Sequence, residues 1–296
     1  MKLYLINKHN QILDLLNSKQ YFILKAADAL HGIETEIIEN ESPYIDGSEI
    51  EDVKALPRGI ELTFKLRGNI KQSIDYFTKI VKSKQFVTLR EIENGRDITI
   101  KGVATIPPYS RMMRSCEIVL SIYCGQPYWE DLEEVIGVID DVISLLNFPK
   151  EGQYFTPTGL PFGVIDKSLT KDLTNKGDVS VGVIFTIVAT GEVVNPQINC
   201  STGEQEGWFM RLNLTLQEGD EVEISTVKNN KYITINGSNY YWGDPIVDYL
   251  EFNGEDWLQL EQGSNVFNIT TTSGNENIYF NATYKRRYEW LIKYRI

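Results

Sequence analysis

Two periodicities of hydrophobic residues mark the first half of the chain. The first predicted helix begins near Asn69, a good N-cap, and its helically spaced apolar residues are Ile70, Ile74, Phe77, Ile80 and Val81. A second helix is predicted from Glu130 to Asn147, where an apolar stripe continues up to Pro149.

Alternation of apolar and polar residues predicts strands around these helices. The clearest segments are Ile60 to Leu66, Phe86 to Arg90, Ile98 to Val103, and a strand between Cys116 and Cys124. The first half therefore predicts a β-dominated α+β domain over residues 1–150, with one or two helices packed on its sheet.

A different pattern follows residue 150. Residues 151–164 are rich in Gly, Pro and Thr and predict a linker. From residue 165 to 296, short predicted strands recur about every ten residues, as in a β-sandwich. These are Val181 to Val188, Phe209 to Leu216, Glu221 to Thr226, Lys231 to Ile235, Trp257 to Leu260, Val266 to Thr271 and Ile278 to Tyr284. Asn236-Gly237 predicts a two-residue hairpin turn.

Charge follows the same division. The 296 residues include 29 basic and 41 acidic ones, a formal net charge of −12. Between Asp172 and Tyr284 there are four basic and sixteen acidic residues, so the excess lies in the second domain. This balance argues against specific nucleic-acid binding and against attachment to anionic membranes.

Sequence motifs for common chemistry are missing. The two histidines, His9 and His31, have no metal-ligand spacing, and Cys116, Cys124 and Cys200 form no CxxC pair. No phosphate-binding loop, hydrolase elbow or zincin motif occurs. The N-terminus lacks the apolar core of a signal peptide, which indicates synthesis in a reducing cytoplasm. We therefore expect no catalytic residues, no cofactor and no metal.

Grouped acids leave one enzymatic alternative open, a small glycan-active enzyme that uses paired carboxylates. The groups are Asp140/Asp141, Asp220/Glu221/Glu223 and Glu255/Asp256. Each falls where a helix face or a turn is predicted, and acids in such places are usually solvated, so we expect no enzyme.

Aromatic residues are frequent in the acidic domain. Trp208, Trp242 and Trp257 are candidate ligand-facing residues, since sugar-binding sandwiches stack pyranose rings on such side chains. The alternative, which we favour, is that these rings fill the sandwich core or a contact between domains.

The order of short motifs resembles one protein family. In the first domain, Pro43-Tyr-Ile-Asp-Gly-Ser precedes Arg67-Gly, Pro107-Pro-Tyr and Cys124-Gly-Gln-Pro-Tyr-Trp-Glu-Asp. In the second, Asn175-Lys-Gly-Asp precedes Leu216-Gln-Glu-Gly-Asp-Glu-Val-Glu-Ile and Trp257-Leu-Gln-Leu-Glu-Gln-Gly-Ser-Asn. Over nearly the whole chain this succession resembles the distal tail proteins of long-tailed, non-contractile bacteriophages (siphophages) and prophages, a siphovirus-type tail component.

The resemblance implies a mainly β protein with a tail-tube-like β-barrel or sandwich followed by a galectin-like β-sandwich. It implies a structural hub of the tail tip or baseplate, a homohexameric ring that connects the tail-tube protein to the tip protein and lets DNA pass. A receptor-binding protein is a further possible partner. The expected location is the virion tail tip, after assembly in the host cytoplasm.

A closed ring requires head-to-tail contacts. Candidate ring-contact segments are a predicted hairpin whose turn holds Glu93, Asn94, Gly95 and Arg96, and the polar stretch from Glu39 to Lys54. An ordinary solvent-exposed hairpin is the alternative for the first of these.

The second domain lacks the His-x-Asn-x-Arg row with which galectins hold galactose, because no histidine follows His31. We therefore expect a docking or spacing module, and a carbohydrate-binding module for host-surface adsorption remains the alternative function.

Overall fold

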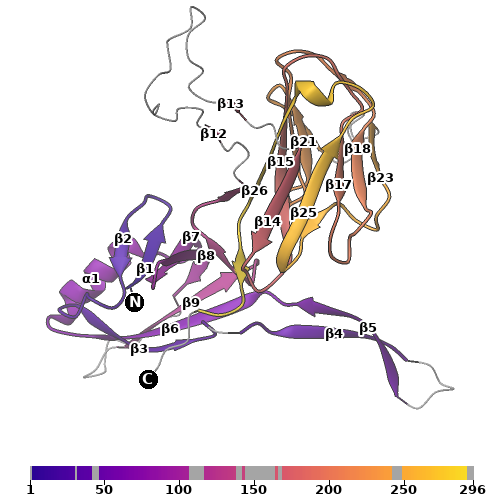
Figure 1. The fold of residues 1–296 in the computed structure, drawn as a ribbon. Helices are drawn as coiled ribbons and strands as arrows, with labels where there is room; N and C mark the ends of the chain where they lie inside the picture. Colours follow the sequence, from indigo (N-terminus) through magenta and orange to yellow (C-terminus); the bar gives the residue numbers. More distant parts are fainter. Residues whose placement is uncertain are drawn as a thin grey trace, which may run out of the picture. The chain divides into compact units, whose positions relative to one another are not determined.

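The computed structural model describes residues 2–30, 32–41, 47–106, 117–137, 142–143, 164–165, 169–241 and 249–291 (Figure 1). The chain forms two compact units. Unit 1 combines Met1–Glu133 with Arg287–Ile296, and unit 2 comprises Glu134–Arg286. Unit 2 is therefore inserted between two parts of unit 1.

Unit 1 is built on an antiparallel nine-stranded sheet with the main order β2-β1-β7-β8-β9-β6-β3. Its strands are β1 (Lys2–Asn7), β2 (Ile12–Asp14), β3 (Phe22–Asp28), β6 (Arg58–Leu66), β7 (Gln85–Glu93), β8 (Arg96–Thr105), β9 (Glu117–Cys124), β10 (Trp129–Asp131) and β27 (Arg287–Tyr288). The predicted alternation is confirmed in β6, where every second side chain is buried. Strands β4 (Thr35–Glu41) and β5 (Ser48–Ala55) form a separate two-stranded sheet.

The first predicted helix is confirmed as α1 (Ile70–Ile80). The Asn69 side chain caps it by accepting hydrogen bonds from the backbone N–H groups of Lys71 and Gln72. Phe77, on the buried face, lies 5.3 Å from Phe64 of β6 and 6.0 Å from Phe22 of β3, measured between ring centroids. These rings attach the helix to the core of unit 1.

Unit 2 is the predicted β-sandwich, and Figure 1 shows its two principal sheets. One has the order β11-β26-β15-β20-β21-β22, with β24 beside β15, and the other the order β14-β25-β17-β18-β23. Phe185 of β15 and Phe267 of β25 meet across the core, with ring centroids 5.3 Å apart. The remaining strands form two short two-stranded sheets, β12 with β13 and β16 with β19. The bounds are β11 (Val135–Gly137), β12 (Val142–Ile143), β13 (Val164–Ile165), β14 (Thr170–Asn175), β15 (Val181–Ala189), β16 (Val193–Val194), β17 (Gln197–Cys200), β18 (Phe209–Leu212), β19 (Thr215–Leu216), β20 (Glu221–Ser225), β21 (Tyr232–Ile235), β22 (Ser238–Tyr241), β23 (Leu250–Phe252), β24 (Gln259–Leu260), β25 (Gly263–Thr270) and β26 (Ile278–Tyr284).

The predicted Asn236-Gly237 turn is confirmed between β21 and β22. Asn236 has φ 49° and Gly237 φ 79°, the left-handed pair that a two-residue hairpin requires.

The second predicted helix, from Glu130 to Asn147, is wrong over its described part. Strands β10 and β11 occupy this segment, and β11 pairs with β26. Val135 and Ile136 are β-branched and Gly137 is a poor helix former, so a partner strand stabilises the extended form. The apolar residues of this segment have the spacing of one helix face, but in the structure they belong to separate short strands.

The boundaries of the two units differ from those of the expected domains, 1–150 and 165–296. The first boundary lies after Glu133, and the chain returns to unit 1 at Arg287. β27 pairs with β10 of unit 1, which places the last described residues in the first unit. Most of the expected linker, 151–164, lies outside the described residues.

Candidate functional site

The hairpin of β4 and β5, here called the arm, has its own sheet and pairs with no other strand of the described chain (Figure 1). All side chains described from residue 35 to 40 and from 48 to 54 are exposed. The arm overlaps the polar stretch from Glu39 to Lys54, which the sequence predicts as a candidate ring contact. A two-stranded hairpin is at best marginally stable by itself in water, so the arm is a natural element for contact with another molecule.

One face of the arm carries three apolar side chains among polar ones. Ile37 of β4 lies opposite Val53 of β5, and Ile50 lies opposite Glu39, two residues further along β4. Residues paired across an antiparallel ladder share a face, as do alternate residues of a strand. Ile37, Ile50 and Val53 therefore form one row, here called the apolar row, whereas Ile38 belongs to the opposite face.

A β-bulge keeps this row continuous. The register shifts between Ile38 and Glu39, because Ile38 pairs with Asp52 while Glu39 pairs with Ile50. Glu51 is the extra residue of β5. Without it, Ile50 would fall on the other face, since one residue of slip reverses a strand's sidedness.

The apolar row is well exposed. Ile37, Ile50 and Val53 are 52%, 60% and 54% exposed. Around them, the two strands carry six acidic residues and one lysine. An apolar stripe with an acidic surround fits a surface that is apolar at its centre and basic at its rim.

The other predicted ring-contact hairpin is the tight turn between β7 and β8. Glu93 pairs with Arg96, and the turn residues Asn94 and Gly95 have φ 50° and 79°. Asn94 and Gly95 are exposed, whereas Arg96 stacks on the ring of Tyr288, with 4.0 Å between its Cζ and the ring centroid. The structure thus places these four residues on a short turn fastened to β27 rather than on a long projection.

Trp257, one of the predicted ligand-facing aromatics, is only 2% exposed and belongs to the core of unit 2. Its backbone N–H donates to Asp256, which also pairs with Lys231, and the Lys231 Nζ lies 5.5 Å from the indole centroid. A ring buried in this way has no free face for a sugar.

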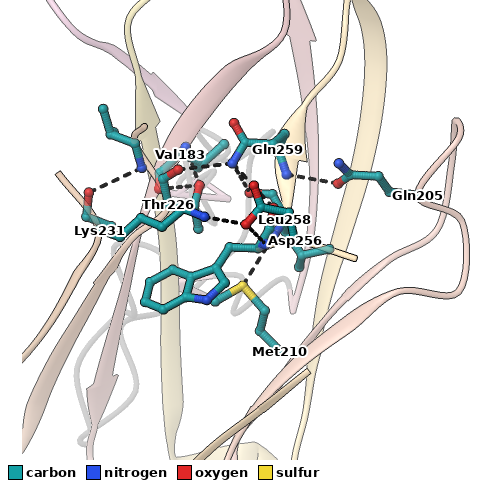
Figure 2. Close-up of polar contacts among 11 residues, drawn as sticks. Val183, Gln205, Met210, Thr226, Lys231, Asp256, Leu258 and Gln259 are labelled. Atoms are coloured by element: carbon teal, nitrogen blue, oxygen red, sulfur yellow. Dashed lines mark hydrogen bonds and ion pairs between the residues drawn. The ribbon is translucent and has the colours of Figure 1, made fainter. Parts of the chain in front are cut away.

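Buried hydrogen bonds fix the segment around Trp257 (Figure 2). The Gln259 side chain donates to the carbonyl oxygen of Thr226 at 3.0 Å, and the Gln259 backbone N–H donates to Oε1 of Gln205 at 2.8 Å. The Thr226 hydroxyl accepts from the backbone N–H of Val183 at 2.8 Å. Because buried polar groups need hydrogen-bond partners, this network fixes the position of the segment around Trp257. The periodicity of the sequence does not predict these hydrogen bonds.

The other two tryptophans give little support to a sugar site. Trp208 is half-buried against the core of unit 2, and its ring occupies the space that a Cβ on Gly254 would need. Trp242 lies outside the described residues. The core interpretation of these aromatics fits Trp208 and Trp257.

The described acid groups have structural partners. Asp220 accepts from the Gln217 backbone N–H and from the Asn236 side chain, which closes the turns beside β20. These contacts lower the pKa of Asp220. Glu223 accepts from the Tyr232 hydroxyl. Asp140 and Asp141 lie outside the described residues.

The described cysteines, Cys124 and Cys200, are buried free thiols. Burial raises the pKa of Cys124 to about 11, which makes it a poor nucleophile. In the ranges that the structure describes, no group of three or more His, Cys, Asp or Glu residues could hold a metal ion. Among the same residues, no helix is long and apolar enough to span a membrane.

Comparison with known proteins gives a family match for part of the chain and a fold for nearly all of it. Residues 176–288 match the family model of the siphovirus-type tail component, C-terminal domain. The crystal structure of phage SPP1 Dit (gp 19.1), described as a paradigm of the hub adsorption apparatus in phages that infect Gram-positive bacteria, superposes with a TM-score of 0.60. The two sequences are 13% identical, and the match covers 96% of this chain and 98% of that one. The chain thus has the mainly β fold of SPP1 Dit, and its residues 176–288 match the tail-component domain.

Two structures of the phage p2 baseplate in its activated conformation, with Sr and with Ca, each match with a TM-score of 0.46 and 13% identity. They cover 98% of this chain and 99% and 100% of theirs. No curated protein matches the sequence. The family match of residues 176–288 and the fold shared with SPP1 Dit agree with the resemblance to distal tail proteins that the motif order indicates.

Proposed function

We propose that this protein is the structural hub of a siphophage tail tip, assembled as a hexameric ring that connects the tail-tube protein to the tip protein and lets DNA pass. The match to the siphovirus-type tail component supports the tail location, and the fold shared with SPP1 Dit supports the hub role. The protein acts through shape and contacts, and no catalytic residue is assigned to it.

The arm is the observation that carries the proposal. A ring forms when one surface of each copy binds a different surface of the next copy and the rotation closes. The apolar row supplies one such surface on every copy. Burying a large aliphatic side chain contributes roughly 1.5–3 kcal/mol, so three per contact, repeated around a ring, are a substantial driving force.

The charge distribution is consistent with two properties of the proposed ring, packing of its copies against one another and passage of DNA. The acidic excess lies between Asp172 and Tyr284 and leaves the rest of the chain nearly balanced. A near-neutral ring domain packs against its own copies without strong repulsion and does not retain the phosphates of passing DNA. The acidic sandwich favours solubility and is a suitable docking or spacing module, with a receptor-binding protein as its proposed partner.

Site-specific photo-crosslinking from the arm tests the proposal. A benzophenone amino acid at Ile50 is expected to join neighbouring copies and to give a ladder of products that ends at six chains. The same probe at Ile38, on the opposite face of the same arm, is the matched control and is expected to give a much weaker ladder. Absence of a ladder from Ile50, or equal ladders from both positions, would remove the arm as the ring contact.

A further inference from the structure

The sheet of unit 1 carries two exposed aromatic side chains on its outer face, the face that points away from the core. Along β7, β8 and β9, alternate residues point to this face. Phe86 of β7 pairs with Val103 of β8, and Val103 pairs in turn with Tyr123 of β9. The three side chains therefore stand side by side across three neighbouring strands and are here called the sheet row.

The sheet row is open to solvent. Phe86 is 72% exposed and Tyr123 is 60% exposed. On the far side of Tyr123 the row ends at Gly59 of β6, where a Cβ would have no atom within 4 Å. The Tyr123 ring therefore has a neighbour without a side chain, which leaves room beside the ring. Contiguous exposed apolar side chains, unlike single ones, mark a surface that binds another molecule.

The rim of the sheet row is basic. Lys82 and Lys84 shortly precede Phe86 in the chain, and Lys101 lies two residues before Val103 on the same face of β8. All three lysines are exposed, and none of the ion pairs in the described part of the chain involves them. No acidic residue occurs from residue 76 to 90 or from 98 to 106. The lysine charges therefore have no acidic neighbour in these two segments.

The arm has the complementary character. Its apolar row of Ile37, Ile50 and Val53 lies on a hairpin with six acidic residues and one lysine. Glu39 shares the face of the apolar row, because it pairs with Ile50. An apolar strip with an acidic surround thus matches an apolar strip with a basic rim, both in hydrophobicity and in charge.

We propose that the arm of one copy docks on the sheet row of the next copy, with its apolar row against Phe86 and Tyr123 and its acids towards the lysines. This inference rests on the proposed ring, whose head-to-tail contacts need two different surfaces on every copy. The arm is the first surface, and the sheet row is the second. Both rows are exposed in the same chain, so the arm does not cover its own sheet row.

Removal of the two aromatic rings tests the sheet row. Phe86→Thr/Tyr123→Thr keeps strand-forming residues at both positions and is expected to weaken association of the full chain roughly tenfold or more. Tyr249→Thr, which removes a 50% exposed tyrosine of unit 2, is the matched control and is expected to leave association within a factor of about two. Wild-type association of the double variant would overturn the proposal.

A mixture of two defective variants gives the sharper result. Phe86→Thr/Tyr123→Thr keeps an intact arm, whereas Ile37→Thr/Val53→Thr keeps an intact sheet row. The mixture is expected to form one-to-one pairs and nothing larger, because one arm occupies one sheet row and neither partner can then extend the assembly. Light scattering should therefore give twice the 33.9 kDa chain mass. A mixture that associates no better than either variant alone would contradict the pairing.

Charge reversal covers the case in which loss of the rings destabilises unit 1. Lys82→Glu/Lys101→Glu is expected to weaken association roughly tenfold, and Glu39→Lys in the same chain is expected to restore part of it. Association that is unchanged by the reversal, or that Glu39→Lys weakens further, would contradict the charge match.

These outcomes separate the sheet row from the hexameric ring. If the wild-type chain forms six-fold rings that Phe86→Thr/Tyr123→Thr leaves intact, the sheet row is excluded and the ring stands. If the mixed variants pair but the wild-type chain does not close at six copies, the sheet row stands and the hexameric ring is excluded.

Discussion

Ile37 of β4 lies directly across from Val53 of β5, and the two side chains are 52% and 54% exposed. Because neither strand pairs with any other described strand, this pair has no cover within the described chain. It is the centre of the surface that we assign to the contact between copies.

Polar substitution of this pair should weaken assembly. In Ile37→Thr/Val53→Thr, both residues stay β-branched, so the hairpin retains its strand propensity while the row loses apolar area. We expect each contact to weaken by about 1–3 kcal/mol, or roughly fivefold to 150-fold, as measured by analytical ultracentrifugation.

Ile38→Thr is the control for this prediction, since Ile38 is 40% exposed on the opposite face of the same hairpin. It is expected to leave the association constant within a factor of about two, in line with ordinary surface substitutions. If Ile38→Thr weakens assembly as much as the double variant, the apolar row is not the specific contact.

The β7–β8 turn is tested by one added charge. Asn94→Asp adds a carboxylate at the exposed tip, and aspartate tolerates the positive φ of this position. If the turn is a ring contact, the charge should weaken association with no change in unfolding midpoint. Deleting Glu93 to Asp97 is less informative, because it also removes the Arg96–Tyr288 stack and the Arg90–Asp97 ion pair. Unchanged association of Asn94→Asp would exclude the tip from the contact.

Glu91 should make unit 1 less stable as the pH rises. Its side chain is 1% exposed, and its Oε1 has no hydrogen-bond partner among the residues that the structure describes. Burial, with a smaller contribution from the Glu93 charge, raises the pKa of Glu91 from 4.5 to about 7. The folded state therefore binds this proton more tightly than the unfolded state, which favours folding at low pH.

The effect has a defined pH window. The free energy of unfolding should fall as the pH rises from about 4.5 to 7, with a total contribution from Glu91 of roughly 3 kcal/mol. Urea unfolding of Glu91→Gln between pH 5 and 8 should lack this slope, whereas Glu61→Gln, which removes an exposed carboxylate of the same sheet, should keep it. A wild-type stability that rises with pH across this window would contradict the assignment.

Trp257→Ala should act on folding and not on ligand binding. The side chain is buried in the core of unit 2, so its truncation is expected to lower the free energy of unfolding by about 3–5 kcal/mol. Tyr249→Ala, at a 50% exposed position of the same unit, should cost far less. Specific glycan or cell-wall binding that is lost in a stably folded Trp242→Ala variant would favour the carbohydrate-binding alternative.

Local signals account for the elements that the sequence predicts well. Asn69 and the apolar face of α1 lie within one segment, and Asn236-Gly237 defines its turn without help from distant residues. The alternation of apolar and polar residues in β6 reflects a strand that packs one face against the core and leaves the other face more exposed. These features depend on neighbouring residues in the chain, which is why sequence patterns detect them.

Long-range pairing explains what the sequence does not predict. β11 is a strand because β26 lies beside it, almost 150 residues further along the chain, and β27 joins unit 1 through β10. The sequence indicates the arm only as a polar stretch. The apolar row depends on the register of two strands and on the bulge at Glu51, which appear only in the structure.

The solution mass of the full chain, measured by light scattering with negative-stain images of the same sample, tests the central claim most directly. The account predicts a particle of six times the 33.9 kDa chain mass, with six-fold symmetry and a central hole, that Ile37→Thr/Val53→Thr disrupts. A chain that stays monomeric, alone and when added to preassembled tail tubes, or that forms a closed two-fold dimer, would contradict it.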